Sequence, residues 1–187
     1  MSKTRITAIA LLVLATASLA GAQDNLKIAP DQQYLLLATT KTSTMQKELD
    51  EAASKGFRVL VGSPTSGAEV AIFLEKTVQP PDTYQYKLLA TTRTGTMQKE
   101  LNEAAAEGYR LLPRTMIAKR GLVAATEIVV LMERAPKEEK RYEYKLLATS
   151  RTSTLQKEVK EARAAGFVIA GMVSRDEHMV IMEKEVH

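Results

Sequence analysis

The stretch YLLLATTKTSTMQKEL, residues 34–49, decides the fold because the chain contains it three times. It returns from Tyr86 as YKLLATTRTGTMQKEL and from Tyr144 as YKLLATSRTSTLQKEV, at spacings of 52 and 58 residues. Each copy continues through an acidic, alanine-rich stretch to a glycine and an aromatic residue. Each then ends in an apolar run closed by an acid and a base. Such internal similarity predicts tandem copies of one structural unit.

Local chemistry predicts a strand and then a helix at the start of each unit. The opening apolar run is short and strand-like. In the first unit, Met45, Leu49 and Ala52 fall on one stripe of a helix. Gly56 then fits the left-handed position that ends a helix, as Gly108 and Gly166 do in the other units.

A Thr/Ser cluster at each helix start predicts side-chain capping of the free backbone amides. Ser43 with Gln46 fits a capping box, and Ser153 with Gln156 repeats it. Gly95 stands at the equivalent place in the second unit, where a neighbouring threonine would take over the cap.

Two strands follow each helix. Pro64 and Pro113 fall late in, or just after, the first of them, which places that strand at a sheet edge. The last strand is the most apolar and lacks proline, so we expect it in the centre, antiparallel to both neighbours. The predicted fold class is α+β: three tandem β-α-β-β modules, each a three-stranded sheet of order 2-3-1 with one helix on one face.

Both alternating sets of side chains in the last strand are apolar. In the second unit they are Ile128, Val130 and Met132 on one side and Val129 and Leu131 on the other. One helix covers only one face, so the second face is expected to be buried as well. We therefore expect the three sheets to pack together through their helix-free faces or to join at their edges.

The beginning of the chain has the composition of a secretory signal peptide. Lys3 and Arg5 precede an apolar run that closes on Ala20-Gly21-Ala22, and the run is short for a membrane helix. A buried N-terminal helix is the alternative. The expected organisation is a signal peptide (1–22), an N-terminal linker (23–32), module 1 (33–77), a linker (78–83), module 2 (84–134), a linker (135–141) and module 3 (142–187).

Net charge and cysteine content argue against some classes of protein. The 187 residues carry a net charge of +4, and loss of Lys3 and Arg5 with the signal peptide lowers it to +2. A balance so near neutral does not favour specific nucleic-acid binding. The chain has no cysteine, so disulfide bonds are excluded and packing must supply the stability. No later segment is expected to span a membrane.

The three units resemble a family of short bacterial domains of unknown function that begin with Tyr-x-Tyr-Lys. The second unit carries this motif at residues 84–87, Leu101-Asn102 in its helix, Gly108-Tyr109 after it and Glu133-Arg134 at its end. The third carries it at residues 142–145, with Gly166-Phe167. The resemblance supports the β-α-β-β reading and implies no activity and no catalytic residue.

The sequence predicts no catalytic residue, metal site or cofactor. Its two histidines are His178 and His187, and their surroundings show no spacing typical of zinc ligands. There is no phosphate-binding or dinucleotide-binding glycine motif. A hydrolase that depends on His178 is the remote alternative.

The pattern predicts two candidate binding sites. Each helix start combines a cation with hydroxyl groups beside free backbone amides, an arrangement that can hold an anion. The residues are Lys41, Thr42, Ser43, Arg93, Thr94, Gly95, Arg151, Thr152 and Ser153. The alternative is that the hydroxyls only cap the helices and the cations are surface residues.

The second candidate site is the longer hairpin of the middle unit, with Arg114, Lys119 and Arg120 as an interaction loop. A basic tip that only improves solubility is the alternative. Together these features predict a non-enzymatic binding or interaction module, periplasmic or secreted, whose partner is another protein, an anionic ligand or an envelope polymer. A structural protein that forms homo-oligomers is the competing hypothesis.

Overall fold

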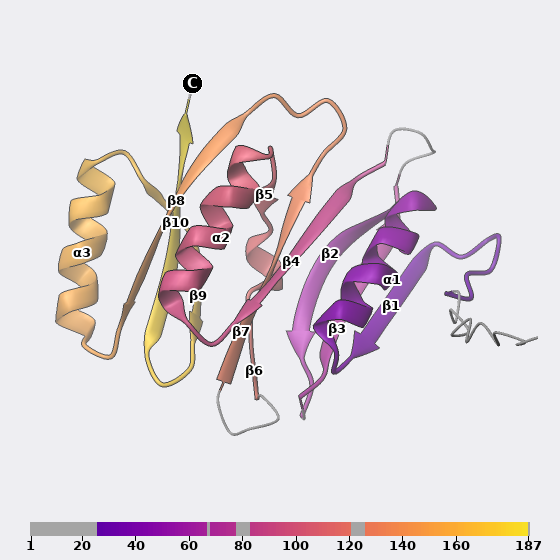
Figure 1. Cartoon of the computed structure of the whole chain (residues 1–187), viewed down its shortest axis with the longest axis horizontal. Helices are drawn as coiled ribbons and strands as arrows, with labels where there is room; N and C mark the ends of the chain where they lie inside the picture. Colours follow the sequence, from indigo (N-terminus) through magenta and orange to yellow (C-terminus); the bar gives the residue numbers. More distant parts are fainter. Residues whose placement is uncertain (1–25, 67, 78–82, 121–125, 187) are drawn as a thin grey trace, which may run out of the picture.

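The structure, a computed structural model, describes residues 26–66, 68–77, 83–120 and 126–186. It contains three helices and three antiparallel sheets that follow one another across the molecule, as Figure 1 shows. The predicted α+β class is thereby confirmed. The signal peptide expected at residues 1–22 and most of the linker expected at 78–83 lie outside the described residues.

The elements repeat in the expected order. The first module contains β1 (Tyr34–Thr39), α1 (Thr42–Ser54), β2 (Phe57–Pro64) and β3 (Val70–Lys76). The second contains β4 (Gln85–Thr91), α2 (Thr94–Ala106), β5 (Arg110–Leu111), the short 3-10 helix η1 (Pro113–Thr115), β6 (Ile117–Arg120) and β7 (Thr126–Arg134). The third contains β8 (Arg141–Thr149), α3 (Thr152–Ala164), β9 (Val168–Ser174) and β10 (His178–Val186).

The last strand of each module is central in its sheet. The first sheet has the order β1-β3-β2 and the third has β8-β10-β9, with antiparallel pairing throughout. The middle sheet has the order β4-β7-β5, and β6 also pairs with β7. It therefore has four strands rather than three, because η1 begins at Pro113 and divides the second strand in two.

The helices end as predicted but begin differently. Gly56, Gly108 and Gly166 have φ values of 89°, 91° and 91°, the left-handed conformation that glycine adopts most easily. At the other end, the N-cap residues are Lys41, Arg93 and Arg151, and none of the three makes a side-chain capping bond.

The predicted capping boxes are therefore wrong. The hydroxyl of Thr39, at the end of β1, accepts a hydrogen bond of 3.2 Å from the Lys41 amide, and the same turn precedes α2 and α3. This turn sets the direction of the chain as it enters the helix. The glutamines of the predicted capping boxes are consequently available for another contact.

Each sheet has two faces: a helix face, on which its own helix packs, and an opposite back face. In the first sheet, Leu35, Leu37 and the residues that pair with them, Leu74 and Ile72, lie on the helix face. One hydrophobic core joins these residues to Tyr86, Val129, Leu131 and Ile117, from the back face of the second sheet. The back face of the second sheet thus packs against the helix face of the first.

The second and third modules repeat this arrangement. Another core joins Met97 and Leu101 of α2 to Tyr144, Met179 and Ile181, from the back face of the third sheet. The modules therefore stack helix face to back face, all in the same direction. We expected the sheets to share their helix-free faces or their edges, and this was wrong. The reason is that one 13-residue helix leaves part of its own sheet uncovered, and the next sheet fills that space.

Candidate functional site

The two junctions between modules use the same set of polar contacts, beginning with a glutamine on the helix. Gln46 of α1 donates from Nε2 to the carbonyl oxygen of Tyr86 at 3.0 Å, and its Oε1 accepts from the Leu88 amide at 2.8 Å. Gln98 of α2 makes the equivalent bonds to Tyr144 at 2.7 Å and Leu146 at 2.6 Å. Each glutamine thus occupies backbone groups at the edge of the next sheet, which would otherwise be open to pairing. We call this contact the edge clasp.

A buried tyrosine hydroxyl forms the second junction contact. The Tyr86 hydroxyl accepts a hydrogen bond of 3.0 Å from the amide of Val59, beside an irregularity in the pairing of β2 with β3. The Tyr144 hydroxyl accepts one of 2.8 Å from the amide of Leu111, at the matching position of the second module. Burial, the largest cause, raises the pKa of both tyrosines above the ordinary value. Both hydroxyls therefore stay protonated at neutral pH.

An arginine and a glutamate form the third contact. Arg58 makes two hydrogen bonds to the Glu133 carboxylate, at 2.9 and 3.1 Å, and its guanidinium lies 4.6 Å from the ring centre of Tyr84. Glu133 also accepts a hydrogen bond of 3.0 Å from the hydroxyl of Tyr86. The hydrogen bond to Glu133 is the largest cause that raises the pKa of Arg58.

The second junction has the same arrangement. Arg110 bonds Glu183 at 2.6 and 3.3 Å and lies 4.5 Å from the ring centre of Tyr142. Its pKa is raised, chiefly by the bond to Glu183. A planar guanidinium that holds a carboxylate with two bonds and stacks on an aromatic ring fixes the relative orientation of two modules better than a point charge.

A cation in the hairpin of the following module provides the fourth contact. Lys119 of β6 donates to the carbonyl oxygen of Thr40 at 3.0 Å and pairs with Glu127 at 3.1 Å. Arg175, in the hairpin between β9 and β10, donates to the carbonyl of Thr92 at 2.7 Å. Both bonds tie the hairpin to the segment just before the preceding module's helix.

The series of junctions leaves a back face uncovered at the first module. We define the head face by Tyr34, Leu36, Val61 and Phe73, all on the back face of the first sheet. Tyr34 is 54% exposed, whereas its equivalents Tyr86 and Tyr144 are 3% and 2% exposed. Leu36 is 58% exposed, and the rings of Tyr34 and Phe73 stack at 5.9 Å between centres.

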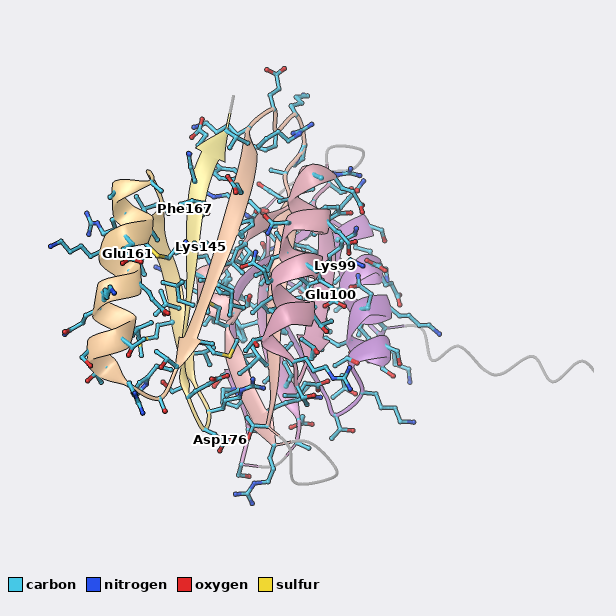
Figure 2. The ribbon with its side chains drawn as sticks, turned by 60° about the vertical axis from the view of Figure 1, so that its left-hand side comes forward. Lys99, Glu100, Lys145, Glu161, Phe167 and Asp176 are labelled. Atoms are coloured by element: carbon cyan, nitrogen blue, oxygen red, sulfur yellow. The ribbon has the colours of Figure 1, made fainter. Side chains whose placement is uncertain are left out.

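A helix face is uncovered at the third module. We define the tail face by Gln156 of α3 with Ile169 and Met172 of β9. Ile169 and Met172 are 51% and 54% exposed, and they pair with the buried residues Met182 and Val180. Ala162 is the one residue of α3 that is buried, whereas α1 and α2 each bury four. In Figure 2, α3, which carries Glu161, stands at one end of the molecule.

The predicted anion-binding residues lie where the three helices begin, along one side of the row of modules in Figure 1. Lys41, Arg93 and Arg151 are the N-cap residues and their side chains are exposed. Thr42, Thr94 and Thr152 are the first helical residues, followed by Ser43, Gly95 and Ser153. Anion binding at these positions stays a prediction.

The predicted interaction loop divides into two parts. Arg114 and Arg120 are exposed, so they stay candidates for contacts. Lys119 is only 5% exposed and is engaged with Thr40 and Glu127, so it does not belong to a free basic surface. The expected tip of the hairpin at Gly121 lies outside the described residues.

Features of other functional classes are sparse in the described part of the chain. His178 shares a hydrogen bond of 3.2 Å with Ser174 within one exposed hairpin. No group of three or more potential metal ligands occurs in the segments that the structure describes. None of the described helices has the length and apolar character needed to cross a membrane. An open hollow of about 650 Å³ lies between α1 and α2, where Lys87 pairs with Glu107 at 2.5 Å.

Sequence reasoning identified one junction residue, Lys119, which it placed in an interaction loop. It did not identify the glutamine, tyrosine, arginine and glutamate contacts, although these residues stand in the repeat. Gln46, Gln98 and Gln156 recur at one position, where the pattern predicted capping boxes for Gln46 and Gln156 and no role for Gln98. The clearest signal was a difference between the copies: an arginine follows the aromatic residue at Arg58 and Arg110, whereas Val168 takes that place in the third unit.

Comparison of the chain with protein-family models, with curated proteins and with solved structures found no match. The resemblance to the Tyr-x-Tyr-Lys domains therefore stays a prediction.

Proposed function

We propose that the protein is an exported, non-enzymatic interaction module of the cell envelope and that its head and tail faces bind protein partners. One observation carries the proposal. The surfaces that join the modules twice within the chain are exposed at both ends, with large apolar side chains on them. Terminal units of repeat proteins normally present a polar outer face, and exposed apolar patches mark interaction sites.

The use of the repeated polar residues supports a role in binding rather than catalysis. The glutamine, tyrosine, arginine and glutamate side chains of the repeat bond the neighbouring module at both junctions. Their chemistry is therefore used to hold surfaces together. Export is proposed from the composition of residues 1–22, which predicts a periplasmic or secreted protein.

Site-specific photo-crosslinking in the producing cells tests the proposal. A photoreactive amino acid is placed at Leu36 on the head face or at Met172 on the tail face. The matched control is Lys99, whose side chain is 75% exposed on the outer side of α2, as labelled in Figure 2. We expect protein adducts from Leu36 and Met172 and none from Lys99.

Absence of protein adducts at both faces, or equal adducts at all three positions, would contradict the proposal. Deletion of residues 1–22 tests export separately, because the shortened chain should remain in the cytoplasmic fraction. Its recovery outside that fraction would show that the leader is not needed.

A further inference from the structure

We infer that the partner of each end face is a second copy of this chain, bound head to tail. This inference rests on the proposed function and names the partner. The helix face of one module and the back face of the next already pack together twice within the chain. The tail face is the third such helix face, and the head face is the remaining back face. The two surfaces are therefore related to each other as the two sides of an internal junction are.

The edge clasp can form between two chains with the same atoms that it uses inside one. Gln156 of α3 is equivalent to Gln46 and Gln98, and it is exposed. At the head, the Tyr34 carbonyl and the Leu36 amide of the edge strand β1 are equivalent to the groups of β4 and β8 that those glutamines bond. The side chain of Gln32 now donates to the Tyr34 carbonyl at 2.8 Å, so this edge already accepts a glutamine amide. Gln156 of a second chain would replace it.

The tyrosine contact is also available between chains. Tyr34 has the place of Tyr86 and Tyr144, whose hydroxyls accept a bond from the amides of Val59 and Leu111. The equivalent amide at the tail is that of Ile169, where the pairing of β9 with β10 again has an irregularity. The exposed side chains of Leu36 and Met172 would be partly covered by the same contact, as Leu88 and Leu146, the equivalents of Leu36, are at the internal junctions.

Two of the four junction contacts are missing between chains, so the association should be weaker than an internal junction. Val168 replaces the arginine that would pair with Glu75, the equivalent of Glu133 and Glu183. The hairpin of the first module has no residue equivalent to Lys119 or Arg175 among its residues 65–69. The two ends therefore carry the apolar and backbone-directed contacts without the ionic ones. This favours reversible association.

A contact between two different faces leaves one free head and one free tail on every complex. Such heterologous contacts continue into rings if the rotation closes and into open helical chains if it does not. The average mass should therefore rise steadily with concentration rather than stop at a dimer, unless a ring closes.

Sedimentation of the purified protein and of two blocked variants tests the inference. Leu36→Asp places a charge on the head face, and Met172→Asp places one on the tail face; both side chains are exposed, and far-UV circular dichroism checks that the variants fold. Each variant alone should be a monomer, because its remaining face finds only copies of itself. Mixed in equal amounts, they should form a complex of two chains and nothing larger.

A finer variant tests the clasp itself. Gln156→Ala should weaken association about tenfold, the effect of losing one to two hydrogen bonds, while the neighbouring exposed control Lys157→Ala should leave it unchanged. Association of either blocked variant with itself would overturn the head-to-tail contact. A wild-type protein that remains a monomer up to about 1 mM would also overturn the contact, because no association with a Kd of about 1 mM or below would then exist. In that last case, adducts of other proteins at Leu36 and Met172 would leave the proposed function standing, and their absence would remove both.

Discussion

Replacement of Tyr86 by phenylalanine should destabilise the protein by about 2–3 kcal/mol. The substitution keeps the ring and removes a hydroxyl that is buried between two modules. The Val59 amide would then lose its partner, and an unsatisfied buried donor costs about 1–3 kcal/mol. The hydrogen bond from Tyr86 to Glu133 would also be lost, but Arg58 still holds that carboxylate with two bonds. This second loss therefore adds only part of its full value.

The repeat provides matched controls for this substitution. Tyr144→Phe removes one bond, to the Leu111 amide, so we expect a smaller loss of about 1–2 kcal/mol. Tyr34→Phe changes an exposed hydroxyl at the same repeat position and should stay within about 0.5 kcal/mol of the wild type. The three equivalent tyrosines should thus give three different losses of stability, the largest at Tyr86, whose hydroxyl makes two bonds, and the smallest at the exposed Tyr34.

Urea unfolding followed by far-UV circular dichroism gives the free energies, since the chain has no tryptophan. A decrease in the slope m for Tyr86→Phe would show that the first module has begun to unfold separately. The reasoning is refuted if Tyr86→Phe and Tyr34→Phe have the same free energy of unfolding.

Three further predictions concern the same junctions. Gln98→Ala removes the edge clasp and should lower the free energy of unfolding by about 2 kcal/mol. Gln156→Ala should change the free energy of unfolding of the single chain by less than about 0.5 kcal/mol. Equal effects of the two variants in urea unfolding would contradict the clasp. Arg58→Ala should cost about 1–2 kcal/mol, reduced by solvent screening, and a double-mutant cycle with Glu133→Gln should show coupling between the two side chains. Alkaline pH should destabilise the protein. The raised pKa of the two buried tyrosines means that the unfolded chain releases their protons first, so above about pH 10 the free energy of unfolding should fall by about 1.4 kcal/mol per pH unit for each. Phenylalanine at both positions should reduce that slope, and an unchanged slope would exclude these tyrosines as its cause.

The parts of the fold that local chemistry determines could be predicted. Gly56 and its equivalents ended the helices because a left-handed residue is needed there, and Pro113 marked an edge strand. The junctions could not be predicted, because their contacts join residues that lie between 27 and 83 positions apart. A glutamine three positions after a serine has the same pattern whether it caps its own helix or bonds the next sheet. Only the three-dimensional position of the neighbouring strand distinguishes the two.

The direction of the predicted packing was wrong for a related reason. Alternation in the last strands correctly indicated that both faces of the middle sheet are apolar, but it carries no information about which face meets which. That depends on how much of a sheet one helix can cover. The exposure of Tyr34, Leu36 and Met172 follows from the ends of the series rather than from any change in the residue pattern.

The edge clasp has a consequence for how such a protein can change its length. Both α1 and α2 bond the edge of the next copy through the same glutamine contact. A further duplication would extend the protein by one unit while leaving the chemistry of its two ends as it is. The number of units can thus vary between descendants of this chain while the contact between neighbouring units stays the same.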